Sequence, residues 1–162
     1  MGKKRKSGSN VKLLLVLGGV AAAGYFWLRS QVKLISFGSV SVPFQQLKGG
    51  RINLGLRLPI INASAIGARV TGFTGFIVAP SGATIGTVFL KNPVKVAPYA
   101  QSTLEFAASI GITDVLSEAG SGLFSDTLPT SWSQLLPYVK KFKLVGQVRI
   151  FGIPVPIEMP LV

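Results

Sequence analysis

The chain has 162 residues, no cysteine, no histidine and a formal net charge of +12 from 17 basic and 5 acidic residues. This composition excludes disulfides, thiolate metal sites, ordinary zinc sites and Ser-His or Cys-His nucleophile pairs within the chain. A chain that is 48% hydrophobic, with 19 glycines and 10 prolines, is typical of one turn-rich β domain whose apolar content is raised by a membrane segment.

Residues 1–11 form a basic N-terminal arm, in which Lys3, Lys4, Arg5 and Lys6 follow one another. Together with Lys12 and Arg29 they supply +6, which is half of the net charge. We expect these six side chains to contact anionic lipid headgroups or phosphates. Nucleic acid is a partner only through this arm.

Residues 12–29 are predicted to form a transmembrane helix. The run from Leu13 to Leu28, LLLVLGGVAAAGYFWL, carries no charge, and as a helix it is about 24 Å long. Lys12 and Arg29 extend the span by placing their charges among the headgroups, and Tyr25 and Trp27 favour the same interface. By the positive-inside rule the arm stays inside and residues 30–162 lie outside.

Two alternatives compete with a retained anchor. A cleavable signal peptide would have the same basic start and would be cut near Ala21-Ala22-Ala23, but the apolar run continues to Leu28. A buried core helix would need a polar face, and none occurs between Leu13 and Leu28.

Beyond Ser30 the hydrophobic period changes to two, which indicates β-strands. The clearest strands are Arg51 to Leu58 and Lys141 to Ile150, because apolar and polar residues alternate along both. Less regular candidates are Val32 to Phe37, Val70 to Val78, Thr84 to Leu90, Val94 to Ala97, Thr103 to Ile112 and Pro154 to Leu161. One short helix starting at Thr113 or Asp114, followed by a loop, completes an antiparallel β-sandwich of seven to eight strands.

The order of these features resembles the LEA type 2 or water-stress-and-hypersensitive-response (WHy) domain family over residues 32–162. The segments that carry the resemblance are INLGLRLPIINAS, GFIVAPSGATIGTVFL, STLEFAASIGITDVL and KKFKLVGQVRIFGIPVPIEMPL. The family's usual Asn-Pro is represented only by Asn62-Ala63, with Pro59 earlier. The resemblance implies a sandwich with one helix, often attached to a membrane, with a binding or protective role and no established catalytic residues. The triplet Asn62-Ala63-Ser64 also matches an N-glycosylation sequon, to which we assign no role.

An enzyme is not expected, and neither a cofactor nor a metal is implied. General acid/base chemistry would fall to Glu105, Asp114, Glu118, Asp126 and Glu158, and the pattern places no two of them convincingly as a pair. No phosphate-binding G-x-x-x-x-G-K-[ST] motif occurs.

Three non-enzymatic functions therefore remain. The first is a structural tether between a membrane and a protein layer beside it, for which the internal membrane and capsid of a lipid-containing virus are one fitting setting. The second is a cell-envelope protein that binds amphiphiles or protects components under stress, which would need an apolar groove. The third, nucleic-acid binding by the sandwich through its exposed basic residues, is less favoured, because those residues are better explained as solubilising the exposed sheet faces. For the tether, the exposed basic residues Lys141, Lys143 and Arg149 are the candidate docking face for a capsid or envelope protein.

Overall fold

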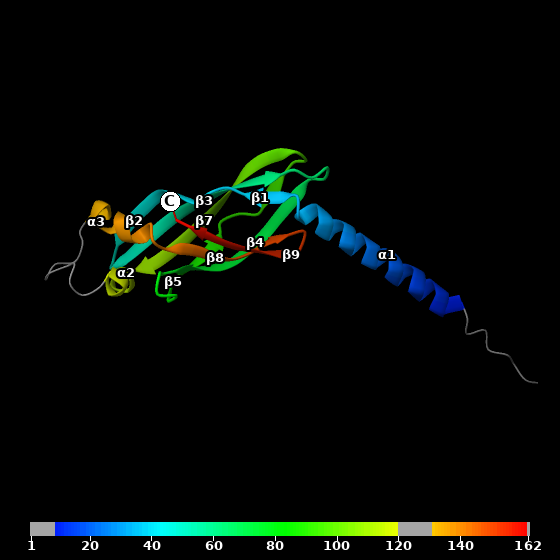
Figure 1. Cartoon of the computed structure of the whole chain (residues 1–162), viewed down its shortest axis with the longest axis horizontal. Helices are drawn as coiled ribbons and strands as arrows, with labels where there is room; N and C mark the ends of the chain where they lie inside the picture. The colour runs from blue at the N-terminus through cyan, green and yellow to red at the C-terminus, as the bar shows by residue number, and fades with distance from the viewer. Residues whose placement is uncertain (1–8, 120–130, 162) are drawn as a thin grey trace, which may run out of the picture.

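The computed structural model describes residues 9–119 and 131–161; for residues 9–19, 44, 119 and 132 it describes the backbone only. One long helix precedes a β-rich domain (Figure 1). The elements are α1 (Ser9–Val32), β1 (Ile35–Phe37), β2 (Ser41–Lys48), β3 (Arg51–Asn62), β4 (Ala68–Val78), β5 (Thr84–Leu90), β6 (Val94–Val96), β7 (Ala100–Gly111), α2 (Ile112–Ala119), α3 (Trp132–Val139), β8 (Lys143–Ile150) and β9 (Ile153–Pro160).

The strands form one curled, antiparallel sheet in the order β1-β3-β7-β5-β4-β8-β9. The short strand β6 pairs with β4, and β2 pairs with β3 alongside β1. An isolated parallel bridge joins Val40, just before β2, to Leu161, just after β9, so the two ends of the sheet order meet. The mostly antiparallel β fold is therefore confirmed, with a single curled sheet of nine strands in place of seven or eight.

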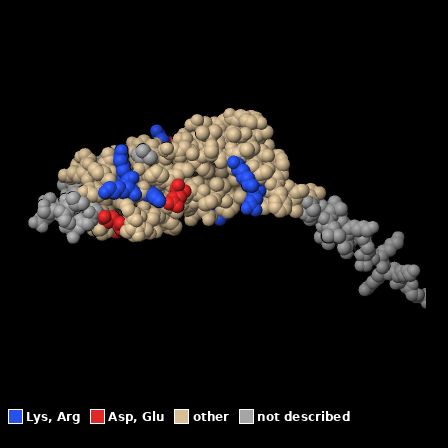
Figure 2. All heavy atoms as spheres, viewed as in Figure 1, with Lys and Arg blue, Asp and Glu red and all other residues tan. Residues whose placement is uncertain are grey.

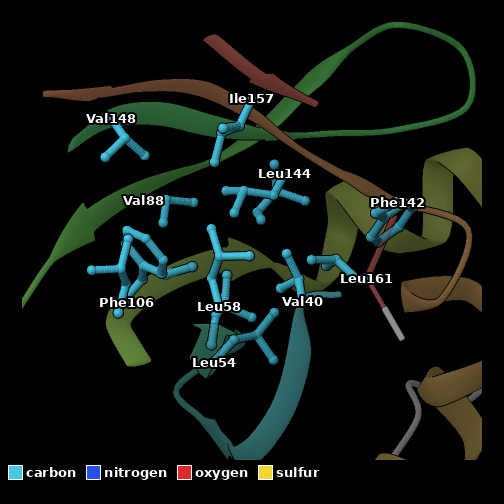
Figure 3. Packing of buried hydrophobic residues seen from close by; sticks show 14 of the residues in the cluster. Val40, Leu54, Leu58, Val88, Phe106, Phe142, Leu144, Val148, Ile157 and Leu161 are labelled. Atoms are coloured by element: carbon cyan, nitrogen blue, oxygen red, sulfur yellow. The ribbon is translucent and has the colours of Figure 1, made fainter. Parts of the chain in front are cut away.

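The hydrophobic core lies between the two halves of this sheet (Figure 3). Leu54 and Leu58 of β3 and Phe106 of β7 lie opposite Leu144 and Val148 of β8. These five side chains are all buried, as the period-two pattern of β3 and β8 predicts. Burial of so many branched and aromatic side chains is the main source of the domain's stability.

Two glycines make room for an aromatic ring inside the sheet. Gly75 of β4 is opposite Gly146 of β8, and the ring of Phe73 covers this pair while packing against Phe106 at 4.8 Å between ring centroids. A Cβ on Gly146 would lie 2.7 Å from the Phe73 ring. The glycines are therefore required by a close approach of side chain to backbone.

The edge strand β9 carries Pro154, Pro156 and Pro160 at alternate positions. Alternate residues of a strand direct their N–H groups to the same side, and a proline has none to give to a neighbour. The prolines pair with Arg149, Gln147 and Lys143 of β8, so they must occupy the positions whose N–H would face away from β8. The free side of β9 consequently has carbonyl acceptors and, at Glu158, one donor.

The predicted strand Val32 to Phe37 is shorter than expected, because Val32 ends α1 and β1 begins at Ile35. Two further elements were not predicted. Strand β2 was not predicted, because Pro43 and the pair Gln45-Gln46 interrupt alternation; it forms with a register shift between Ser41 and Phe44 and pairs only with β3. Helix α3 was expected to be loop because of Pro137, which lies inside the helix. The region from residue 112 to 139 thus contains two short helices among the described residues, and the predicted one is α2.

Candidate functional site

The basic residues predicted to contact a membrane lie at or beyond the start of α1. Lys3, Lys4, Arg5 and Lys6 are outside the described residues, and only the backbone of Lys12 is described, within α1. Arg29 is exposed in the last turn of α1. Tyr25, Phe26 and Trp27 are more than half exposed on the same helix. Within the residues whose side chains are described, no helix has both the length and the apolar character that a membrane span requires.

The junction between α1 and the sheet is short and packed. Val32 at the end of α1 is buried, and the N–H of Leu34 donates to the carbonyl of Gln31 at 3.0 Å. Only two residues separate α1 from β1. The N–H of Ala63, beyond β3, donates to the carbonyl of Leu34 at 3.0 Å. This geometry ties α1 closely to one end of the domain, which we call the α1-proximal end.

A buried polar cluster holds the loops of the α1-proximal end together. The Asn62 amide Nδ2 donates to the carbonyls of Ile66 at 2.8 Å and Ala97 at 2.9 Å. Its Oδ1 accepts from the backbone N–H of Ser64 at 3.1 Å and from the Ser64 hydroxyl at 2.6 Å. Both side chains are 0% exposed. The Asn62-Ala63-Ser64 triplet is therefore an internal crosslink of the folded domain.

The three residues predicted to form a docking face are exposed but spread over the length of β8. Lys143 donates to Glu158 on β9 at 2.7 Å, and this hydrogen bond lowers the pKa of the Glu158 carboxyl. Lys141 precedes β8, with its ammonium 5.8 Å from the centroid of the Tyr138 ring. Arg149 is six residues from Lys143, about 20 Å along the strand. The structure therefore does not gather the three cations at one point.

Arg149 instead belongs to a basic cluster that the sequence did not reveal. Arg69 of β4 is directly opposite Lys95 of β6, and Arg149 is opposite Gly72 on the other side of β4. All three side chains are exposed, as is Lys33 beyond α1. On the face drawn in Figure 2, the basic side chains nearest α1 have no acidic side chain beside them, and both acidic groups lie farther from α1.

A shallow hollow of about 700 Å³ lies on the outer face of β4, β8 and β9. Its lining is mainly apolar with one carboxylate: Thr74, Phe76, Val145, Gly146, Gln147, Pro156, Ile157 and Glu158. Phe76 is 43% exposed there. The hollow is open to solvent on the outside of the sheet.

The described acidic residues form ion pairs or lie in α2. Glu105 accepts from Arg57 on the neighbouring strand at 3.3 Å. Glu118 accepts from the Ser81 hydroxyl at 2.6 Å, and Asp114 lies in the first turn of α2. Asp126 is outside the described residues. No group of three or more potential metal ligands occurs within the described part of the chain.

Comparison with known proteins identifies neither a family nor a curated relative: no family model and no curated protein matches the chain. Among solved structures, a protein from Archaeoglobus fulgidus has a TM-score of 0.47 and 13% identity, over 76% of this chain and 91% of that one. A beta-glucuronidase from glycoside hydrolase family 2 has a TM-score of 0.47 and 14% identity, over 76% of this chain and 11% of that one. An apo PmoF2 PCuAC domain has a TM-score of 0.37 and 13% identity, over 79% of this chain and 89% of that one.

Proposed function

We propose that this protein is a single-pass, membrane-anchored, non-enzymatic tether that displays a β domain directly beside the bilayer. The observation that carries the proposal is the junction between α1 and the domain. Helix α1 contains the uncharged stretch of sequence, and only two residues lie between its last residue and β1. Val32, the last residue of α1, packs in the domain's core. With a long flexible linker, the distance between the domain and the helix would vary, whereas this short connection keeps that distance fixed.

The domain's role in this proposal is to bind or brace a protein next to the membrane. The end opposite α1 carries α2, α3 and the β2–β3 turn (Figure 1). That end would meet the partner, a capsid or cell-envelope component, because β3 places it about 36 Å from the α1-proximal end. The LEA type 2 resemblance agrees with a binding role and stays part of the proposal. The N-terminal arm would remain on the inner side.

The test of the anchor is extraction of the full chain from membranes. Wild-type protein should resist carbonate and high salt. In the double variant Val20→Asp/Ala21→Asp, two charges near the middle of the run would cost about 5 to 7 kcal/mol of insertion free energy, so we expect release. The matched control Val20→Leu/Ala21→Leu should stay membrane-bound. Release of intact wild-type protein by salt alone contradicts the proposal.

Retention of the anchor is tested separately from insertion. Mass spectrometry of the mature protein should find peptides that precede Ala23. A mature N-terminus at Gly24 would indicate a signal peptide instead, and the domain would then be released after cleavage.

A second candidate function, binding of an amphiphile, is favoured by the outer hollow. Its apolar lining would take an alkyl chain, and the Lys143–Glu158 pair at its margin would take a polar headgroup. A fluorescent fatty acid should bind the wild type and lose most of its affinity for the Phe76→Gln variant. Equal binding to both would remove this candidate.

A further inference from the structure

The α1-proximal end of the domain carries cations without anions. Lys33, Arg69, Lys95 and Arg149 are exposed there, and none forms an ion pair or side-chain hydrogen bond with a residue that the structure describes. The described acidic residues lie on β7, α2 and the part of β9 that pairs near the start of β8. No described side chain therefore compensates the charge of this end.

The arrangement of these cations is unfavourable for the isolated domain. Arg69 and Lys95 are direct cross-strand partners, and like charges in directly opposite positions destabilise a strand pair. Arg149, on the other neighbour of β4, brings a third positive charge to the same outer face. An anionic surface would convert this mutual repulsion into attraction.

An exposed aromatic residue in a strained conformation lies at the same end. Tyr99 has φ +53°, a left-handed conformation that costs a residue with a Cβ about 1 to 2 kcal/mol. Its side chain is 75% exposed, so burial does not offset this cost. Its N–H donates to the carbonyl of Ser64 at 3.3 Å, which links the strained loop to the buried Asn62 cluster. Tyrosine is a residue type enriched at membrane–water interfaces.

The length of the junction places this end at headgroup level. Lys33 lies four positions after Arg29, which is at the predicted edge of the hydrocarbon. At about 1.5 Å per residue this is about 6 Å, and the headgroup layer on each side of a bilayer is about 5 to 8 Å thick. A domain joined there contacts the bilayer surface whenever its long axis is near the membrane normal.

We propose that the α1-proximal surface, defined as Lys33, Arg69, Lys95, Tyr99 and Arg149, binds the headgroups of anionic phospholipids in the bilayer that α1 enters. This inference rests on the proposed anchor and adds a lipid class and a second attachment. Helix and surface together fix the domain upright, because two separated attachments prevent it from tilting.

The test uses the full chain in lipid vesicles. Since the chain contains no cysteine, one introduced cysteine can be labelled uniquely with a fluorophore. Ala97→Cys places the label beside Tyr99, and the control Ala83→Cys places it in the turn between β4 and β5, at the opposite end. Quenching by a spin label on the lipid headgroup then reports proximity of either end to the membrane.

With phosphatidylserine in a phosphatidylcholine vesicle, the label at 97 should be quenched strongly and the label at 83 should not. Replacing Arg69, Lys95 and Arg149 by Gln should lower the ratio of docked to undocked domain on the order of 100-fold, since each cation near an anionic surface contributes about fivefold. A matched triple variant, Lys48, Lys91 and Lys140 to Gln, changes the same net charge elsewhere and should leave quenching intact. Salt at about 1 M, where the Debye length is about 3 Å, should abolish docking.

Equal quenching at 97 in vesicles with and without phosphatidylserine overturns the inference, and so does an equal loss in both triple variants. Preferential binding of single-stranded DNA, with no effect of phosphatidylserine, would assign the surface to nucleic acid. If carbonate releases the protein from these vesicles, the proposed anchor is wrong. That failure is distinguishable from a failure of headgroup binding, because release by carbonate does not depend on the charge of the lipid.

Discussion

Asn62→Ala should be among the most destabilising single substitutions in the domain. Its amide group crosslinks the end of β3 to the carbonyls of Ile66 and Ala97 and to both the N–H and the hydroxyl of Ser64. A neutral hydrogen bond contributes about 1 kcal/mol net, and a buried partner left without one costs about 1 to 3 kcal/mol. With at least three partners affected, we expect the free energy of unfolding to fall by about 3 to 5 kcal/mol.

The matched control is Asn53→Ala on the same strand. Asn53 is half-buried and makes no side-chain hydrogen bond with a described residue, so its loss should change the free energy of unfolding by about 0.5 kcal/mol or less. Urea unfolding of the full chain in detergent, followed by circular dichroism, measures both values. Hydrogen exchange at the N–H of Tyr99 should accelerate only in Asn62→Ala, because Ser64 would no longer be held. Equal midpoints for the two variants would refute the proposed crosslink.

The other predictions concern β8 and its neighbour β9. Leu144→Ala should lower the free energy of unfolding by about 2 to 5 kcal/mol, because it leaves a cavity at a fully buried position. The control Val145→Ala, on the outer face, should lower it much less. A lower melting temperature for Val145→Ala than for Leu144→Ala would mean an inverted register. The pKa of Glu158 is lowered from its ordinary value of 4.5 by the hydrogen bond and charge of Lys143, so this pair stabilises the fold above the unfolded-state pKa, and the contribution disappears as pH falls through the lower folded-state pKa. An NMR titration should find that midpoint below 4.5 in the wild type and nearer 4.5 in Lys143→Gln; an unchanged midpoint would show that the pair does not form in solution.

The parts of the fold that were predictable are those where the sequence itself shows clear alternation of apolar and polar residues or flanking turn residues. In β3, Ile52, Leu54, Leu56 and Leu58 alternate with polar residues or glycine, and all four are buried. Such alternation needs only a sheet with one buried face, so it can be read without knowing the partner strand. The bounds of β5 were predicted to the residue because turn residues flank it on both sides.

The missed elements have weak or competing signals. Strand β2 contains Pro43, and its pairing is fixed by β3 rather than by its own pattern. Helix α3 contains Pro137, which favoured a loop, yet Ser131 and Gln134 form a Ser-x-x-Gln helix start in which the N–H of Ser131 donates to the Gln134 side chain at 3.4 Å. That spacing was the available signal for a helix.

The α1-proximal surface was not predictable because it depends on register. Arg69, Lys95 and Arg149 lie on three strands and are separated by 26 to 80 residues, so only the pairing of β4 with β6 and β8 brings them together. The role of Asn62 was equally hidden. Asn62 donates to the backbone carbonyls of Ile66 and Ala97, and any residue type could provide such a carbonyl, so the sequence does not reveal these partners.

The prolines of β9 have a consequence for many copies of this chain on one surface. Anchored copies would meet side by side at high local concentration, the condition under which exposed strand edges join into continuous sheets. Pro154, Pro156 and Pro160 leave the free side of β9 with a single backbone donor, at Glu158, which is too few for another strand to pair along it. Copies could then crowd a membrane densely without joining along β9, so each domain would stay a separate unit at this edge.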